Sequence, residues 1–404
     1  MNPDLSRLQA YPFERLAALK TGVTPPTHLA HIALSIGEPK HPPPAFVLDV
    51  LRNSLAGLGA YPTTAGSDDL RATCARWLER RFGLGAKSLS LGNVLPVNGT
   101  REALFAFAQA VVGRNAGGRG TSGPPLVAMP NPFYQIYEGA ALLAGAEPYF
   151  IDTPATQNFL PDLASVPAAI WDRVQLLYLC SPGNPGGAVM SVGQWRQALE
   201  LAHRHDFIIA ADECYAELYA DESSPPPSLL SAAAAAGDPS FERCVVFHSL
   251  SKRSSLPGLR SGFVAGDARL LAQFLAYRTY HGCAMPLPTQ AASVAAWNDE
   301  GHVIENRRLY REKFAKVMPI LAPHLDFNRP EGGFYLWAGV RGDDEHFARE
   351  LFAEQNVTVL PGSYLARSVG GKNPGAGRIR ISLVATVDEC IEAAARIARF
   401  ASRS

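Results

Sequence analysis

A lysine, two serines and an arginine follow a short apolar run in the stretch VVFHSLSKRSSLPGLRSGF, residues 245–263. Ser249, Ser251 and Arg260 are residue types that hold a phosphate, because hydroxyls and a planar guanidinium match its oxygen atoms. Lys252 lies among them and is either one more phosphate ligand or a nucleophilic amine. Arg260 is expected to disfavour the charged form of Lys252, and a neutral amine can condense with an aldehyde.

Another apolar run, residues 94–97, leads into Gly99, Thr100 and Arg101 and then into a helical pattern. Backbone N–H groups at the start of a helix bind anions, and the small Gly99 lets a phosphate approach closely. A plain helix cap is the alternative interpretation. Taken with the serines and Arg260, the stretch predicts a second part of a phosphate site.

Acid, amide and phenol side chains follow other apolar runs. Residues 207–211 end at Asp212, and Tyr215 lies three residues further on. A carboxylate at the end of a core strand needs a partner, since an unpaired buried charge is costly; an Asp that caps a helix is the alternative. Asn184 lies in the turn SPGNPGG, and Tyr134 lies in PNPFYQIY.

The elements that must position these residues alternate along the chain. Short apolar strands are predicted at 94–97, 126–129, 174–180, 207–211, 245–250 and 262–265, with helices at about 100–113, 134–144, 191–205 and 268–278. An earlier helix is predicted from Ser67 as its cap to Gly83 as its stop. The alternation favours an α/β fold with a mostly parallel sheet flanked by helices. Ligands of such sheets bind at the carboxyl ends of the strands.

The length of 404 residues favours two domains. We predict an N-terminal arm with part of a small domain at 1–50, a large cofactor-binding domain at 51–290, and a smaller C-terminal α+β domain at 291–404 that begins with a helix near 300–321. Residues 1–50 are expected to be irregular because they are rich in proline. The segments 117–125 and 225–239 are expected to be surface loops.

Composition excludes several classes of protein. Basic and acidic residues balance at 37 each, which argues against nucleic-acid and membrane partners. The six scattered cysteines are typical of a reduced, cytoplasmic protein. The sequence GRGTSG, residues 118–123, formally matches GxGxxG, but it precedes a strand instead of following one, so a flexible loop is favoured over a dinucleotide site. No metal-binding motif occurs, and HRH at 203–205 is expected only to complement a helix dipole.

The strand ends together offer what pyridoxal 5′-phosphate requires. Lys252 can condense with its aldehyde, and Asp212 can pair with the ring nitrogen and keep it protonated. Asn184 and Tyr215 can hydrogen-bond the ring oxygen, and Tyr134 can stack on the ring. The phosphate is assigned to Gly99, Thr100, Arg101, Ser249, Ser251 and Arg260.

The order of these motifs resembles that of the class I/II aminotransferases, pyridoxal-phosphate enzymes of fold type I. The matching stretches include SIGEP, YPTTAGSDDLR, VNGTREALF, PNPFY, SPGNPGG, DECYAEL, SLSKRSSLPGLRSG, EGGFYLW, LPGSYL and RIRISL, which span nearly the whole chain. The resemblance implies a large domain with a seven-stranded sheet, and Lys252 as the lysine that binds the cofactor and moves the proton. It also implies that Arg380 clamps the substrate α-carboxylate beside the Gly37 backbone. Tyr61 would reach the cofactor phosphate of a neighbouring subunit in a homodimer.

The N-terminal stretch LQAYPFERLAALKTGVTPP is similar to that of bacterial succinyldiaminopimelate aminotransferases of lysine biosynthesis. This similarity implies glutamate as amino donor and N-succinyl-2-amino-6-oxopimelate as acceptor. Such an acceptor carries several carboxylates, so cations besides Arg380 are expected. The candidates are Lys40, Arg101, Arg253, Arg278 and His281.

Three competing interpretations stay open at the level of sequence. The first is another reaction on the same scaffold, either transamination of aspartate or aromatic substrates, racemisation, or a β-lyase reaction. The second is a ligand-sensing regulator, which the short N-terminal segment and the zero net charge disfavour. The third is a nucleotide-binding oxidoreductase, which the misplaced GxGxxG disfavours.

Overall fold

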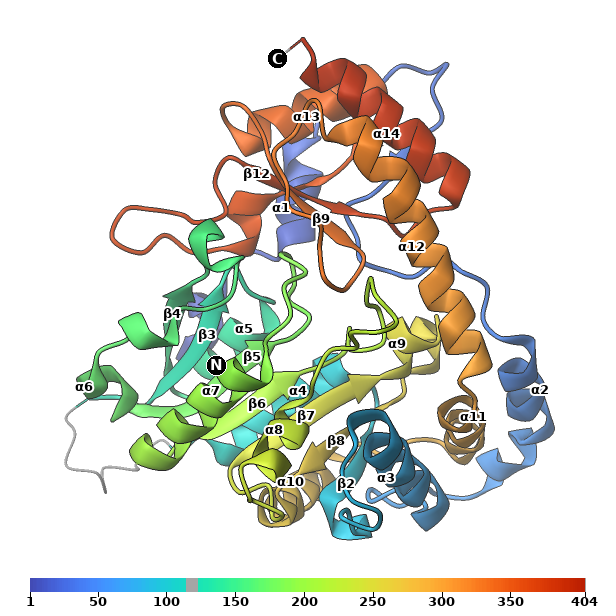
Figure 1. Ribbon diagram of the computed structural model, residues 1–404, viewed down its shortest axis with the longest axis vertical. Helices are drawn as coiled ribbons and strands as arrows, with labels where there is room; N and C mark the ends of the chain where they lie inside the picture. Colours follow the sequence, from blue (N-terminus) through green and yellow to red (C-terminus); the bar gives the residue numbers. More distant parts are fainter. Residues whose placement is uncertain (114–122, 404) are drawn as a thin grey trace.

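The computed structural model describes residues 1–113 and 123–403. Most of the predicted loop at 117–125, including GRGTSG up to residue 122, therefore lies outside the described residues. A broad sheet wrapped by helices fills the lower part of Figure 1, and a smaller sheet that is also covered by helices lies above it. Helix α12 (Gly301–Leu321) runs along the right side of the view from the upper part towards the lower one.

The large sheet has seven strands in the order β2-β8-β7-β6-β5-β3-β4 among the described residues. Their bounds are β2 Val94–Val97, β3 Leu126–Asn131, β4 Glu147–Asp152, β5 Val174–Cys180, β6 Ile208–Asp212, β7 Cys244–Ser249 and β8 Gly262–Gly266. Strand β8 is antiparallel to both of its neighbours, β2 and β7, and the other described strands of this sheet share one direction. The predicted mostly parallel, seven-stranded α/β sheet is confirmed, and six of its strands lie within two residues of their predicted bounds.

Helices cover both faces of this sheet because its strand residues are apolar on both sides. Leu177, Ile209 and Val246 face one core, whereas their neighbours Tyr178 and Ala210 face the other. The first face carries α2 Ala45–Asn53, α3 Asp68–Phe82, α6 Ala168–Trp171, α7 Val192–His205, α8 Leu229–Ala235 and α11 Leu287–Asn298. The second face carries α4 Thr100–Val111, α5 Ile136–Leu143 and α10 Ala268–His281.

The predicted boundaries of α3 are confirmed by its caps. The Ser67 hydroxyl accepts a hydrogen bond from the Leu70 amide at 3.3 Å, and Gly83 ends the helix with a φ of 64°. Glycine adopts this left-handed conformation without strain. Helix α3 then places Trp77 beside β8 and α11 in the first core.

The upper part is built on an antiparallel sheet in the order β11-β12-β9. Its strands are β9 Tyr335–Gly339, β11 Leu360–Pro361 and β12 Arg378–Ser382, and its core also receives side chains from α12, α13 Asp344–Gln355 and α14 Val387–Ala401. Beside it, β1 Ile32–Ala33 pairs in parallel with β10 Val357–Thr358. The α9 turn is Leu250–Arg253, and the 3-10 turns are Pro3–Arg7, Leu55–Gly59, Leu91–Asn93, Ala155–Gln157, Leu163–Ser165, Pro257–Leu259 and Gly362–Leu365. The domain bounds at 50 and 290 remain predictions.

Two proline-rich segments that were predicted to be irregular contain helices, so those predictions were wrong. In the first 50 residues, α1 (Pro12–Leu19) begins with a proline at its first position, where no N–H bond is lost. In 225–239, Ser228 caps α8, which buries Leu229 and Leu230. Proline at or shortly before the first residue of a helix therefore marks the start of that helix in both segments.

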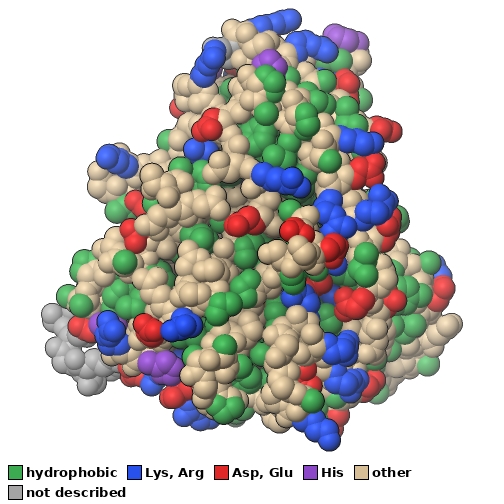
Figure 2. All heavy atoms as spheres, viewed as in Figure 1, with side chains coloured by type: hydrophobic (Ala, Val, Ile, Leu, Met, Phe, Trp, Pro, Cys, Tyr) green, Lys and Arg blue, Asp and Glu red, His purple; other side chains and the backbone are tan. Residues whose placement is uncertain are grey.

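Charged side chains are spread over the surface. On the face shown in Figure 2, basic and acidic groups are interspersed and form no single-sign field. No helix in the described part of the chain has the length and apolar character needed to cross a bilayer.

Candidate active site

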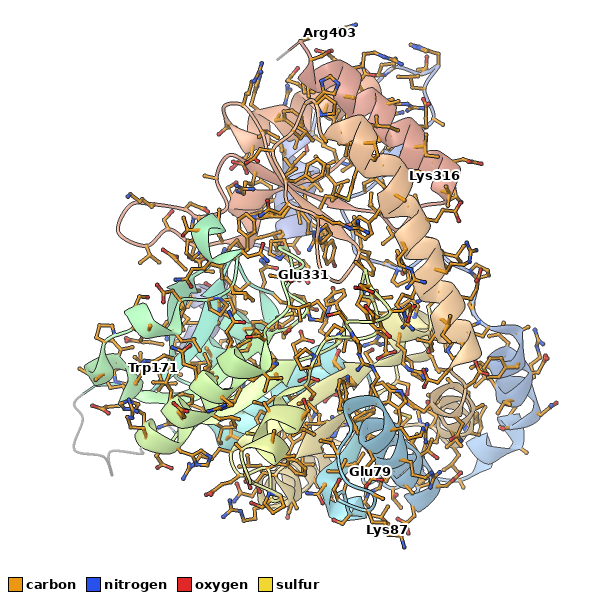
Figure 3. The ribbon with its side chains drawn as sticks, in the orientation of Figure 1. Glu79, Lys87, Trp171, Lys316, Glu331 and Arg403 are labelled. Carbon is orange, nitrogen blue, oxygen red and sulfur yellow. The ribbon has the colours of Figure 1, made fainter. Side chains whose placement is uncertain are left out.

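A cavity of about 560 Å³ lies at the carboxyl ends of the large sheet, under the upper part of the molecule. Residues from β6, β7, α4, β12 and the N-terminal segment line it. Figure 3 labels Glu331 in the region between the two parts, just ahead of the strand that brings Tyr335 to the cavity. The predicted site residues in the lining are Gly37, Thr100, Arg101, Tyr134, Asn184, Asp212, Tyr215, Ser249, Ser251, Lys252, Arg260 and Arg380.

The amine of Lys252 points into this cavity from the α9 turn. It donates a hydrogen bond to the carbonyl of Gly37. Burial, opposed by Cys214 and Glu38 and assisted by the cations Arg380 and Arg101, lowers the pKa of Lys252 to about 8. The sequence had assigned this effect to Arg260; the contributing cations instead come from β12 and α4. A substantial fraction of the amine is therefore neutral and nucleophilic near pH 8.

The carboxylate of Asp212 is buried at the end of β6. The Tyr137 hydroxyl donates to its Oδ2 at 2.7 Å, and the Cys214 amide donates to its Oδ1 at 3.3 Å. Burial raises the pKa of Asp212 because desolvation disfavours the charge. A cationic partner in the cavity would offset that cost, and a protonated pyridine nitrogen is such a partner.

Tyr137 is itself held rigidly. Its ring stacks on Tyr178 with centroids 4.5 Å apart and an interplanar angle of 9°. The Tyr178 hydroxyl donates to the Leu104 carbonyl of α4 at 2.6 Å. The Asp212 carboxylate is thus oriented by a buried aromatic pair that is anchored to a neighbouring helix.

The end of the cavity away from Asp212 is shaped for an anion. Gly99 has a φ of 92°, and a Cβ there would overlap the guanidinium of Arg260. The guanidinium donates to the Pro257 carbonyl at 2.9 Å and lies beside the start of α4, which Thr100 opens. A cation, the Thr100 and Ser249 hydroxyls and a helix N-terminus match a phosphate. The residues present therefore fit pyridoxal phosphate at both of its ends.

Arg380 reaches the cavity from β12 and is buried. Its Nη1 donates to Asn184 Oδ1 at 3.0 Å, and its Nη2 donates to the Ser35 carbonyl at 2.7 Å. Its buried Nε has no hydrogen-bond partner among the described residues. Because the guanidinium also lines the cavity, the site suits a carboxylate ligand, which arginine can bind through two parallel hydrogen bonds.

Phenol groups line the wall between these charges. The Tyr215 and Tyr335 hydroxyls lie 2.8 Å apart, and the Tyr335 ring lies 4.4 Å from the Arg380 guanidinium carbon. On the other side, Arg101 Nε donates to the Tyr134 hydroxyl at 2.6 Å. Tyr134 and Tyr215 are thus fixed by neighbours that themselves line the cavity.

Several lining residues were missed from the sequence. Tyr335 was quoted only within EGGFYLW, and the Gly37 next to it has no room for a Cβ because of the Tyr335 hydroxyl. Tyr11 and Phe13 come from the N-terminal segment. The aromatic PFE start of α1 was visible, but nothing local in the sequence places it at the strand ends of the large sheet.

Other predicted residues lie elsewhere. Tyr61 is fully exposed and does not line the cavity of its own chain. Arg253 is buried between Trp77 and Trp297 and bonds Glu300, and Arg278 pairs with Glu102. Both were wrong as candidates for a distal substrate cation in this cavity. Lys40 and His281 are likewise not among the described residues that line the cavity, whereas Arg101 is.

The fold and the cavity define a pyridoxal-phosphate enzyme of fold type I. The family model described as aminotransferase class I and II matches residues 30–397. The chain belongs to this family, which uses pyridoxal phosphate to act on amino acids and keto acids. Aminotransferases of this fold are typically dimeric.

Relatives and solved structures agree with this assignment. The chain is 33% identical to a probable aminotransferase of Mycobacterium tuberculosis, over 96% of this chain and 84% of that protein. It is 31% identical to an LL-diaminopimelate aminotransferase of Nitratidesulfovibrio vulgaris, over 91% and 90%. An aminotransferase structure from Neisseria meningitidis shares 49% identity with a TM-score of 0.92 and covers 98% and 99% of the two chains. A probable N-succinyldiaminopimelate aminotransferase from Thermus thermophilus shares 28% identity with a TM-score of 0.82, over 96% and 100%.

Proposed function

We propose that this aminotransferase transfers the amino group of glutamate to N-succinyl-2-amino-6-oxopimelate and yields N-succinyl-LL-2,6-diaminopimelate. The observation that carries the proposal is the pair of cations in one cavity, Arg380 with an unpartnered Nε and Arg101 at the rim. A substrate with more than one carboxylate satisfies both. The N-terminal similarity and the Thermus thermophilus relative support the same substrate class.

The chemistry that pyridoxal phosphate supplies when bound is a covalent link through its aldehyde and an electron-accepting ring. In our assignment Lys252 makes that link and then carries the proton between the substrate α-carbon and the cofactor. Its lowered pKa lets it do so near neutral pH. Asp212, which the Tyr137 hydroxyl orients, would hold the ring nitrogen in its protonated form.

The remaining groups bind and orient. Asn184 and Tyr215 are assigned to the ring oxygen, and Tyr134 to the ring face. The phosphate is assigned to the cradle of Gly99, Thr100, Arg101, Ser249, Ser251 and Arg260. Arg101 lines the cavity, is exposed and donates to the Tyr134 hydroxyl, so we assign it also to the distal carboxylate of the substrate.

Arg380 is assigned to the substrate α-carboxylate. Its two Nη groups donate to Asn184 and Ser35, which fixes the guanidinium among the residues that line the cavity. The Gly37 backbone lies next to Lys252 and Tyr335, where it borders the same carboxylate.

Assembly and location form part of the proposal. We assign a homodimer in the cytoplasm, in which Tyr61 reaches the cofactor phosphate of the other subunit. The full exposure of the Tyr61 side chain in the single chain supports this role, and six free cysteines suit a reducing compartment.

A second candidate substrate is LL-diaminopimelate without the succinyl group, because curated relatives at 31% and 30% identity are named LL-diaminopimelate aminotransferases. The scaffold is also compatible with transamination of aspartate or aromatic amino acids, and with a lyase reaction. These reactions differ in the substrate side chain that the cavity must recognise.

An acceptor panel tests the proposal. The purified enzyme is given glutamate and, separately, the succinylated keto-diacid, oxaloacetate and phenylpyruvate, and LL-diaminopimelate is tried as donor with 2-oxoglutarate. The highest kcat/KM is expected for the succinylated acceptor. A higher value for any other substrate would replace the assignment, and release of pyruvate and ammonia from an amino acid with a leaving group on its β-carbon would indicate a lyase.

A further inference from the structure

Residues 36–44 form a strap whose first three residues line the cavity. Its Gly37 carbonyl accepts the hydrogen bond from the Lys252 amine, and its His41 carbonyl accepts one from the Ser255 hydroxyl at 2.8 Å. The strap therefore contacts the segment around Lys252 at two places. Its position decides how Gly37 and Glu38 line the cavity.

A chain of three polar side chains joins this strap to α12 and back to the Lys252 segment. Lys313 Nζ lies 2.7 Å from His41 Nε2, and His41 Nδ1 lies 2.8 Å from Asn306 Oδ1. Asn306 Nδ2 lies 3.0 Å from the Lys252 carbonyl and 3.1 Å from the Arg253 carbonyl. None of the three side chains lines the cavity.

The chemistry of the groups assigns a direction to every bond in the chain. An ammonium can only donate, so His41 Nε2 accepts and its proton is on Nδ1. His41 then donates to the Asn306 oxygen, which leaves the Asn306 amide group to donate to the two carbonyls. In each hydrogen bond from Lys313 through His41 and Asn306 to the two carbonyls, a donor thus faces an acceptor.

Lys313 is an unusual residue for a purely structural position. Its side chain is 1% exposed, and no carboxylate lies within ion-pair distance of it in the described residues. Its other hydrogen-bond acceptor is the Val384 carbonyl at 3.5 Å, and it lies 4.8 Å from the centroid of the Tyr310 ring. Burying an amine is costly, and an apolar residue would fill the same space at less cost.

We propose that Lys313, His41 and Asn306 form a relay of positioning residues that locks the strap onto the turn carrying Lys252. The relay holds Gly37 beside the reactive amine and keeps the Lys252 backbone in register with α12. It acts through Lys252 and touches neither substrate nor cofactor. The inference rests on the role proposed for Lys252.

Acid should release the relay. Protonation of His41 turns Nε2 from an acceptor into a donor that faces the Lys313 ammonium. Burial and the nearby Lys313 lower the pKa of His41, while Asn306 and Glu305 oppose that shift, so release is expected below pH 6.5. Lys313 itself faces Lys40 of the strap and Glu389 and Cys390 of α14, and burial lowers its pKa to about 8.

The test compares Lys313→Met with Lys316→Met, one turn further along α12. Lys316 points outward in Figure 3 and forms an ion pair with the partly exposed Glu312, so the same substitution there leaves the relay intact. Deuterium uptake of peptides covering residues 35–44 and 250–256 is measured in protein without added cofactor. Lys313→Met should exchange faster in both peptides, and Lys316→Met should match the wild type.

Kinetics give a second readout. Loss of one buried hydrogen bond changes an equilibrium or rate constant by about 3- to 10-fold. Lys313→Met should therefore raise KM for glutamate or lower kcat by that factor. His41→Asn keeps the donor towards Asn306 but loses the Lys313 contact. It should therefore resemble Lys313→Met, and the double variant should be no worse than either single one.

The outcomes decide between a relay and mere stability. Wild-type exchange and kinetics in Lys313→Met, additive effects in the double variant, or a lower Tm with unchanged local exchange would each overturn the relay. If Lys313→Met does not fold, the isosteric Asn306→Asp takes its place: it replaces the N–H donors towards the two carbonyls by a carboxylate oxygen that repels them. Faster local exchange in a protein that shows no transamination at all would sustain the relay and reject the proposed function.

Discussion

The floor and the rim of the cavity are built in different ways. The floor consists of strand ends of one sheet, where Asp212, Tyr137 and Tyr178 are linked by contacts within the large sheet and its α4 and α5 helices. The rim combines Tyr11, Glu38 and Arg101, which come from distant parts of the chain. The residues assigned to the chemistry are therefore positioned by one sheet and its helices. The residues assigned to substrate recognition are positioned by contacts between segments that are far apart in the sequence.

The largest effect is expected at the floor. Lys252→Ala should lower kcat by about 10⁴-fold, because the amine is the proton carrier in our assignment. Lys316→Ala serves as the matched control. Steady-state assays and the absorption spectrum of the cofactor-loaded protein check this. Retained turnover in the Lys252 variant would place the reactive amine elsewhere.

Asp212→Asn should have the next largest effect, with a loss in kcat of about 10²- to 10³-fold and a smaller change in cofactor affinity. The neutral amide cannot stabilise a protonated ring nitrogen. Tyr137→Phe removes only the hydrogen bond to the carboxylate and should cost about 3- to 10-fold. Equal kcat in the Asp212 variant and the wild type would contradict the assigned floor.

The titration of Lys252 provides a pH test that needs no turnover. A pKa of about 8 leaves roughly half of the amine neutral at pH 8, against about one part in 300 for an ordinary lysine near 10.5. Acylation of protein without added cofactor should therefore mark Lys252 early and rise through pH 8. Mass spectrometry of the labelled peptide checks this, and a rise only above pH 10 would show an unshifted amine.

The smallest effect is expected at the outermost part of the rim. Tyr61→Phe should weaken cofactor binding by only about 3- to 10-fold, as one hydrogen bond to phosphate is lost. Cofactor titration at protein concentrations above and below the dimer dissociation constant measures this. A loss that is the same in monomer and dimer would show that Tyr61 acts within its own chain or not at all.

The sequence predicted the floor well because its signals are local. Apolar runs that end in Asp212, in Ser249 and in Gly99 mark the strand ends directly. Strand β4 was missed because it lies at the edge of the sheet, and five of its six residues are exposed or only partly buried. Such a strand lacks the apolar run that the others show.

The rim was predicted less well because charge type alone does not say where a side chain points. Arg253 and Arg278 were plausible substrate cations, yet both are enclosed by aromatic rings or acids away from the cavity. Their burial depends on helices α10 to α12, far along the chain. The contribution of Tyr11 likewise depends on a long-range contact.

The antiparallel pairing of β8 with β7 has a consequence for how the enzyme loses activity. The segment from Leu250 to Ser261 leaves one inner strand and returns on the adjacent one, and its two ends are hydrogen-bonded to each other at 3.1 Å. The segment that carries Lys252 therefore cannot come loose without separating β7 from β8. On heating, we expect selectivity among acceptors to degrade first, while the capacity to bond an aldehyde persists until the whole molecule melts.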